Sequence, residues 1–194
     1  MRIYGSRVVL ITGLLCSILW LQSCASSRLA TPSSDTKPVA KTEAPPLHRR
    51  LSEKELKRKY ASMLQTSTKH IRNKRLYYFI DEWWGTRYKY GGNDRNGVDC
   101  SGFSTQLYRQ VYEMQIKRTS NLQYETTSRI KKVKRLEEGD LLFFGTPSSK
   151  NISHVGIYLQ NDYFVHSASG KGVSISNLHD AYWEKCFVAG GRVK

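Results

Sequence analysis

The stretch Gly97-Val98-Asp99-Cys100-Ser101-Gly102-Phe103 decides how the rest of this chain is interpreted. Behind it, apolar side chains recur every four residues at Phe103, Leu107 and Val111, a spacing typical of a helix. Cys100 is therefore expected in or next to the first helical turn, where unpaired N–H groups and the positive end of the helix dipole favour a thiolate. A thiolate is a nucleophile, whereas a lone cysteine is more often a small buried apolar residue, and this stretch alone allows both roles.

Length and charge limit the possible classes of protein. The chain has 194 residues, enough for one domain and an appendage, and 39% of them are hydrophobic. The formal net charge is +15, but residues 75–194 hold only 17 Lys or Arg against 12 Asp or Glu. Because most of the excess lies before residue 75, ahead of the core of the expected domain (77–194), nucleic acid is not an expected partner. A basic tether that follows an anionic surface and a merely solvated linker are both consistent with this distribution.

Only two of the four cysteines, Cys100 and Cys186, fall in the expected domain. Two cysteines do not make a disulfide framework, and no metal-ligand spacing such as Cys-x-x-Cys occurs. We therefore expect no disulfide, no metal and no cofactor, and we expect Cys186 to be buried in a strand.

The N-terminal sequence is typical of an export signal. Arg2 and Arg7 precede an uncharged, mostly apolar run at 8–21, whose 14 residues suit the core of a signal peptide and are too few to span a bilayer. Leu21-Gln22-Ser23-Cys24 then resembles a bacterial lipobox, with ordinary secretory cleavage as the alternative. The resemblance implies a signal peptide at 1–23 and a mature chain anchored to a membrane through lipid, including palmitate, on Cys24.

Residues 24–50 contain four of the five prolines and many Ser, Thr and Lys residues, a composition typical of a disordered tether. The residue after the lipidated cysteine is Ala25 rather than the aspartate that marks inner-membrane retention in some bacteria. The expected location is therefore the outer membrane, facing the periplasm.

Residues 51–194 are expected to form the domain, which begins with two helices. Ser52 and Glu55 make a capping box for a helix near 53–65, and a second helix over 74–84 ends at Gly85. Five apolar segments separated by turns then predict strands at 141–144, 154–159, 163–166, 173–175 and 187–193. Helices followed by strands with short connections indicate an α+β domain with an antiparallel sheet of about five strands.

His154 and His166 flank the turn between two of these strands. A three-residue loop would place both histidines on one face, with Cβ atoms about 5–8 Å apart, whereas a two-residue loop would place them on opposite faces. We expect the three-residue loop and a Cys100 helix packed against the histidine-bearing face. His154 would then act as the base for Cys100 and His166 would orient His154, while the Cys100 N–H and the Tyr88 hydroxyl are candidate oxyanion donors.

Six ordered blocks within residues 77–194 resemble the NlpC-type family of papain-like cysteine peptidases, and particularly its murein endopeptidase lipoproteins. The blocks lie at 85–92, 99–103, 118–123, 139–144, 154–158 and 164–167, and the segment 182–185 also matches. The resemblance implies a papain-like fold with Cys100 as the nucleophile, His154 as the base, His166 as the third member and Tyr88 near the active site. It also implies hydrolysis of amide bonds in peptidoglycan stem peptides or cross-links, which carry D-amino acids and free carboxylates, through a thioester acyl-enzyme.

Asp99, Ser101 and Arg118 are candidate substrate contacts, with capping of the Cys100 helix as the alternative role for Asp99. Two other functions stay open: an amidase that cuts between muramic acid and the first alanine, and a non-catalytic wall-binding lipoprotein. An acyltransferase on the same scaffold fits an exported, anchored protein less well. The bond that is cut, D,L or D,D, is not specified by the residues, and we expect a monomer.

Overall fold

The computed structural model describes residues 50–194 of the chain. The expected signal peptide, the Cys24 lipidation site and the tether as far as residue 49 lie outside the described residues. No helix within the described part is long and apolar enough to cross a membrane.

The described chain begins with helices that pack against one another. Helix α1 spans Glu53–Met63, the short helix η1 spans Thr68–His70, and α2 spans Lys74–Trp83. The predicted capping box is confirmed: the Glu55 N–H donates to Ser52 Oγ at 3.3 Å and the Ser52 N–H donates to Glu55 Oε2 at 2.8 Å. Gly85 follows α2 with a φ of 72°, a backbone conformation that favours glycine and ends the helix as predicted.

The predicted helix behind Cys100 is also confirmed. Helix α3 spans Cys100–Leu107, and the periodic segment continues as a π-helical turn, η2, over Tyr108–Tyr112. Glu113, with a φ of 59°, ends this turn. The first part of the chain therefore supplies three packed helices, and the third carries the cysteine on its first residue.

The predicted α+β class with an antiparallel sheet is confirmed, but the sheet has six strands in the order β3-β8-β4-β5-β6-β7. The five predicted strands are present as β4 (Leu141–Thr146), β5 (Ser149–Tyr158), β6 (Tyr163–Ala168), β7 (Gly172–Asn177) and β8 (Phe187–Arg192). The edge strand β3 (Ser128–Ile130) was not predicted, and neither was the hairpin β1 (Asn93–Asp94) with β2 (Gly97–Val98). Three short helices complete the domain: α4 (Ser120–Thr126), η3 (Val133–Arg135) and α5 (Ala181–Cys186).

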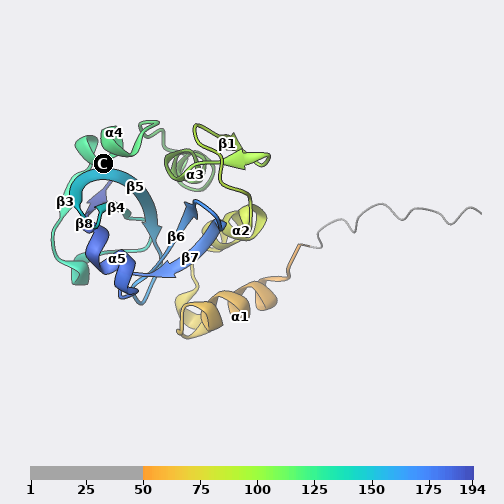
Figure 1. Ribbon diagram of the computed structural model, residues 1–194. Coiled ribbons are helices and arrows are strands. Elements are labelled where there is room, and N and C mark those ends of the chain that lie inside the picture. Colours follow the sequence, from red (N-terminus) through yellow and green to blue (C-terminus); the bar gives the residue numbers. More distant parts are fainter. Residues whose placement is uncertain (1–49) are drawn as a thin grey trace, which may run out of the picture. The chain divides into compact units, whose positions relative to one another are not determined.

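The two faces of the main sheet pack against different partners (Figure 1). Val155, Ile157 and Val165 face α2 and α3 in the larger of two apolar cores. The neighbouring residues Phe144 and Phe164 point the other way, into a smaller core that α5 covers. Alternate residues of a strand point to opposite faces, so the central strands β4 and β6 contribute to both cores.

Candidate active site

The Cys100 end of α3 is held by its N-cap residue, Asp99. The Gly102 N–H donates to Asp99 Oδ1 at 2.6 Å, which satisfies one of the N–H groups that a helix start leaves unpaired. Gly102 has no room for a side chain, because a Cβ there would lie 2.3 Å from the Gly92 carbonyl oxygen. The glycine loop before α3 therefore packs directly on its first turn and fixes the position of Cys100.

Asp99 also forms an ion pair with Arg118, which follows the π-helical turn. The guanidinium donates to both carboxylate oxygens at 3.0 Å, and it donates to Ser101 Oγ at 3.0 Å. Burial alone would raise the pKa of Asp99, but hydrogen bonds from Arg118 and from the Gly102 and Gly91 N–H groups outweigh it and lower that pKa. The geometry thus gives Asp99 the capping role. Of the three candidate substrate contacts, Arg118 keeps the most exposed side chain.

The three-residue loop between β5 and β6 is confirmed. Tyr158 pairs with Phe164, and the Leu159 N–H still donates to the Tyr163 carbonyl at 2.9 Å, which leaves residues 160–162 as the loop. Both histidines consequently share one face of the sheet. Their rings meet at a distance of 2.8 Å between His154 Nε2 and His166 Nδ1. The remaining nitrogen of His154, Nδ1, is left available for a proton transfer.

The expected packing of α3 on the histidine-bearing face is wrong. Phe103 of α3 packs on the face that carries Val155, whereas the imidazoles extend from the opposite face. The pairing of β5 with β6 extends from the turn only to Ile157. The part of β5 that precedes Ile157 therefore has no partner strand on this edge. There the Val155 N–H lies within hydrogen-bond reach of the Cys100 sulfur. The start of α3 therefore meets the edge of β5 rather than its face, next to the backbone of His154.

The titration behaviour of the site also differs from the expectation. Burial raises the pKa of the Cys100 thiol, although the N–H groups of Val155, Ser101 and Cys100 partly oppose the shift. Burial lowers the pKa of His154 to about 4, even though the ring keeps some contact with solvent. Burial, and then the neighbouring His154, holds the pKa of His166 well below its ordinary value. The resting site therefore holds a neutral thiol and two neutral imidazoles, because desolvation outweighs the helix dipole.

Two residues that adjoin the histidines were missed by the sequence analysis. Trp183 of α5 stacks on His154 with ring centroids 5.3 Å apart and meets His166 edge-on at 4.8 Å. Ser176 Oγ of β7 lies 3.1 Å from His166 Nε2, the nitrogen that His154 does not contact. Trp183 lies in one of the matched segments, and Ser176 lies on the strand predicted next to His166, so both could have been proposed from the sequence.

The accessible part of the site is a groove of about 550 Å³. The predicted residues Tyr88, Asp99, Cys100, Ser101 and Arg118 all line it, together with Tyr90, Gly91, Thr119, Ser120, Asn121, Ile152 and Ser153. Burial raises the pKa of Tyr88, and the charges of Cys100 and Asp99 raise it further, so its hydroxyl stays a hydrogen-bond donor. The residue types and their arrangement suit nucleophilic acyl transfer to the thiol.

The described residues also show how possible metal ligands and the two cysteines are placed. Within 50–194 no group of three His, Cys, Asp or Glu side chains is placed to hold a metal ion. Cys100 and Cys186 are both free thiols. Cys186 is buried, as expected, but it ends α5 rather than lying within a strand.

Comparisons with known proteins agree with this geometry. A search of curated proteins finds the probable endopeptidase NlpC of Escherichia coli K12, which is 42% identical over 114 residues, or 59% of this chain and 73% of that protein. It also finds the protein named murein DD-endopeptidase MepS/murein LD-carboxypeptidase of the same strain, 38% identical over 114 residues. That match covers 58% of this chain and 58% of the relative, so this chain spans little more than half of it.

Solved structures show the same fold. The NlpC/p60 domain of the peptidoglycan hydrolase SagA superposes with a TM-score of 0.53 at 28% identity, covering 63% of this chain and 99% of that domain. The predicted papain-like fold of the NlpC type is therefore confirmed. The model of the NlpC/P60 family matches residues 85–192, more than half of the sequence. The resemblance seen in the sequence is thus confirmed, and the chain belongs to the NlpC/P60 family.

Proposed function

We propose that this protein is a cysteine endopeptidase that hydrolyses amide bonds in peptidoglycan stem peptides or their cross-links. The observation that carries the proposal is the hydrogen-bonded pair of His154 and His166, of which His154 directly follows a residue that lines the same groove as the Cys100 thiol at a helix start. The relatives named endopeptidases support the substrate class. A protein that only binds the wall has no need for this combination of groups.

Catalysis begins from the neutral site. As the Cys100 sulfur attacks the substrate carbonyl carbon, its proton passes to the free Nδ1 of His154. The carbonyl oxygen becomes an oxyanion, which the Cys100 and Ser101 N–H groups at the helix start and the Tyr88 hydroxyl stabilise. Collapse of this intermediate breaks the C–N bond, and the leaving amine takes the proton from His154. Water then hydrolyses the thioester, with His154 as the base.

The groups behind His154 keep its ring in position. His166 Nδ1 contacts His154 Nε2, and Ser176 contacts the other nitrogen of His166. These two hydrogen bonds select the tautomer in which Nδ1 of His154 is the free proton acceptor. Trp183 covers both rings and keeps water away from the bond between them. These groups act through His154 rather than on the substrate.

The three candidate substrate contacts differ in how exposed their side chains are. Arg118 lines the groove with a partly exposed side chain, and its four terminal N–H groups already donate to Asp99, Ser101 and Gly92. Its remaining contribution is a positive charge that attracts a free carboxylate of a stem peptide. The hydroxyl of Ser101 and the carboxylate of Asp99 are already engaged with Arg118. Their contribution to binding is therefore to hold Arg118 in place.

The rest of the chain serves localisation. Residues 1–23 form a signal peptide, Cys24 carries the lipid, and residues 24–50 tether the peptidase domain of 51–194 to the periplasmic face of the outer membrane. The protein acts as a monomer without nucleic acid. The exported, envelope location is supported by the relatives, and the lipid and the choice of membrane rest on the N-terminal sequence alone.

Incubation of the full-length chain with purified muropeptides, followed by mass spectrometry, tests the function. Cleavage within stem peptides is expected, and Cys100→Ala should lower the rate at least about 1,000-fold, since the covalent route is lost. Cys186→Ala is the matched control and should keep activity. Products in which whole peptides are released from muramic acid would instead identify an amidase, and unchanged turnover in Cys100→Ala would reject both enzymes.

A further inference from the structure

A second pocket lies at the β3 edge of the sheet, away from the interior strands β5 and β6 that carry the histidines. The segment from Arg129 to Arg135 contains five Lys or Arg residues and no acid. Without these five cations, residues 75–194 hold 12 basic and 12 acidic residues. The positive excess of residues 75–194 is therefore concentrated on β3, η3 and their connection.

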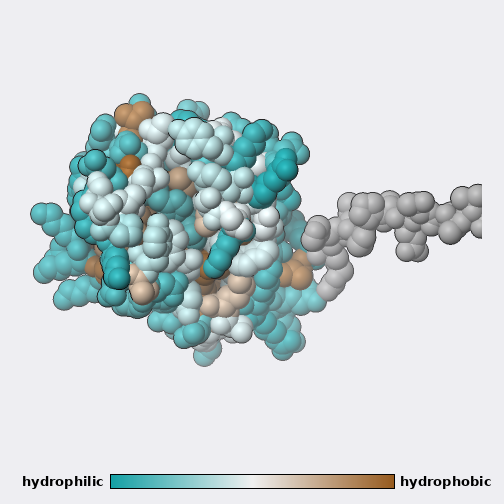
Figure 2. All heavy atoms as spheres, viewed as in Figure 1, coloured by the Kyte–Doolittle hydropathy of each residue, from teal (hydrophilic) through white to brown (hydrophobic). Residues whose placement is uncertain are grey.

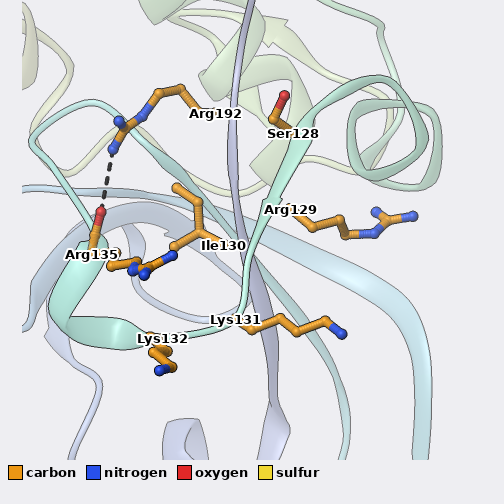
Figure 3. A pocket seen from close by; sticks show the side chains of 7 residues that line it. All are labelled: Ser128, Arg129, Ile130, Lys131, Lys132, Arg135 and Arg192. Carbon is orange, nitrogen blue, oxygen red and sulfur yellow. Dashed lines mark hydrogen bonds between the residues drawn. The ribbon is translucent and has the colours of Figure 1, made fainter.

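This segment lines a pocket of about 470 Å³ together with Arg192 of β8 (Figure 3). Arg135 and Arg192 meet on one side of Ile130, where an Arg192 guanidinium N–H donates to the Arg135 carbonyl at 3.3 Å, and Lys131 extends on the other side. We call Lys131, Lys132 and Arg135 the basic surface. Hydrophilic side chains project from this margin of the molecule, where β3 lies (Figure 2).

Within the part of the chain that the structure describes, the charges of the basic surface have no acidic partner. Arg192 pairs with Asp140 and Glu137, and Arg129 stacks on Tyr124. Among residues 50–194, by contrast, no carboxylate pairs with a member of the basic surface, and all three side chains are exposed. Like charges held together without counter-charges repel one another, and an anionic partner would relieve that repulsion.

We propose that the basic surface binds carboxylates of the peptidoglycan network, outside the groove in which one stem peptide is cut. This inference rests on the proposed function, because that function supplies a polymer with repeated free carboxylates. Helix α4 joins the two sites: Ser120 at its start lines the groove, and β3 begins two residues after its end at Thr126. Its seven residues span about 10 Å, and the five residues from Thr126 to Lys131 add at most about 17 Å, so Ser120 and Lys131 are less than about 30 Å apart. A cross-linked wall fragment held in the groove can therefore reach the basic surface with a neighbouring peptide.

The shape and composition of the pocket favour this polymer over a lipid surface. The exposed large apolar side chains of the described residues are Trp84, Tyr90, Leu122 and Tyr182, and none of them lines the pocket. A surface that inserts into a bilayer interface presents such side chains beside its cations. A concave site with cations around one isoleucine fits a short peptide that carries carboxylates.

The test measures binding to intact sacculi and turnover of a soluble muropeptide. The parent is the full-length chain with Cys24→Ser, so that no lipid masks weak binding. The basic-surface variant adds Lys131→Gln/Lys132→Gln/Arg135→Gln to this parent. The matched control, Lys54→Gln/Arg58→Gln/Lys69→Gln, removes three exposed charges on and near α1. The basic-surface variant should bind pelleted sacculi about tenfold less than the control at low salt, and the difference should disappear near 0.5 M salt. Turnover of a soluble muropeptide should stay within twofold in both variants.

Three results would overturn the inference. One is equal sacculus binding in the two variants. Another is a selective loss of binding to phosphatidylglycerol vesicles with sacculus binding retained, which would assign the surface to lipid. The third is self-association of the variant without any loss of sacculus binding, which would mean that the cations only protect the edge strand β3. A parent chain that binds sacculi through this surface but does not cleave the soluble muropeptide would reject the proposed function and leave the inference standing.

Discussion

The two faces of the main sheet differ in how they are built. The face toward α2 and α3 belongs to a core of 24 buried side chains, whereas the face toward α5 belongs to a core of only six. Yet both catalytic histidines of the proposed mechanism lie on the sparsely packed face, and their cover is a single helix of six residues. Most of the stability therefore comes from one side of the sheet, and the alignment of the catalytic groups comes from the other.

Cys100 contacts both the larger core and the strand that carries His154. Cys100 belongs to the larger core, but it meets the edge of β5 beside His154. The larger core holds the thiol and the smaller core holds the imidazole pair, so the two can be perturbed separately. A substitution in the larger core should lower the stability without altering the chemistry. A substitution in the smaller core should alter the chemistry with little effect on stability.

The largest effect is expected from Phe103→Ala on the α3 side. Phe103 is fully buried, and its ring contacts Phe79 and Trp83 at centroid distances of 5.7 and 6.0 Å. Loss of the ring should lower the free energy of unfolding by about 3–5 kcal/mol, measured by urea denaturation. Phe103→Leu is the milder control, at about 1 kcal/mol. A Phe103→Ala chain as stable as the control would contradict the assignment of stability to this face.

A smaller effect, on the chemistry, is expected from Trp183→Leu on the α5 side. Because burial lowers the pKa of His154 to about 4, loss of the indole should move that pKa up toward its ordinary value of about 6.5. The acid limb of the kcat/KM profile should shift to higher pH, and kcat should fall by up to about fourfold at pH 6 and about tenfold at pH 5.5, with KM little changed because Trp183 does not line the groove.

Trp183→Phe keeps an aromatic ring over the imidazoles and should recover most of the profile. If Trp183→Leu and Trp183→Phe gave the same pH profile as the parent, Trp183 would be only a packing residue. The pH profile separates these outcomes, because a purely structural defect lowers the amount of active enzyme at every pH.

The smallest effect concerns the pH dependence of stability. The pKa of His154 is about 4 in the folded protein and about 6.5 in the unfolded chain, so the unfolded state binds more protons between these values. The contribution of neutral His154 to the free energy of unfolding is complete above about pH 6.5 and is lost as the pH falls from about 6.5 to about 4. The Tm should be about 5 °C lower at pH 5 than at pH 7. His154→Gln/His166→Gln should reduce this difference, and an unchanged difference would mean that other groups cause it.

Local patterns in the sequence predicted much of this site. The four-residue spacing behind Cys100 places it on a helix start, and the count of residues between the histidine strands determines that both rings share a face. Both features depend on residues that are close in the sequence. Side chains repeat every 3.6 residues in a helix and every two residues in a strand, and a single sequence shows both periods.

What could not be predicted depends on contacts between distant segments. The expectation that α3 lies on the histidine face was wrong because strands β4 and β6 carry apolar residues on both sides, so either face of the sheet was suitable for packing. The sign of the Cys100 pKa shift was wrong because burial depends on the whole fold. The edge strand β3 has only three residues and lies in a charged stretch, so its pairing with β8 left no periodic signal.

The burial of the two cysteines has a practical consequence for chemical labelling. Cys186 is fully buried, and Cys100 is 7% exposed at the bottom of the groove. Because the resting thiol is neutral, simple alkylating reagents should label the peptidase domain slowly. A peptide-like electrophile that occupies the groove and accepts the sulfur as His154 removes its proton should label Cys100 alone. Such a reagent would report the fraction of molecules with an intact active site directly in intact cells.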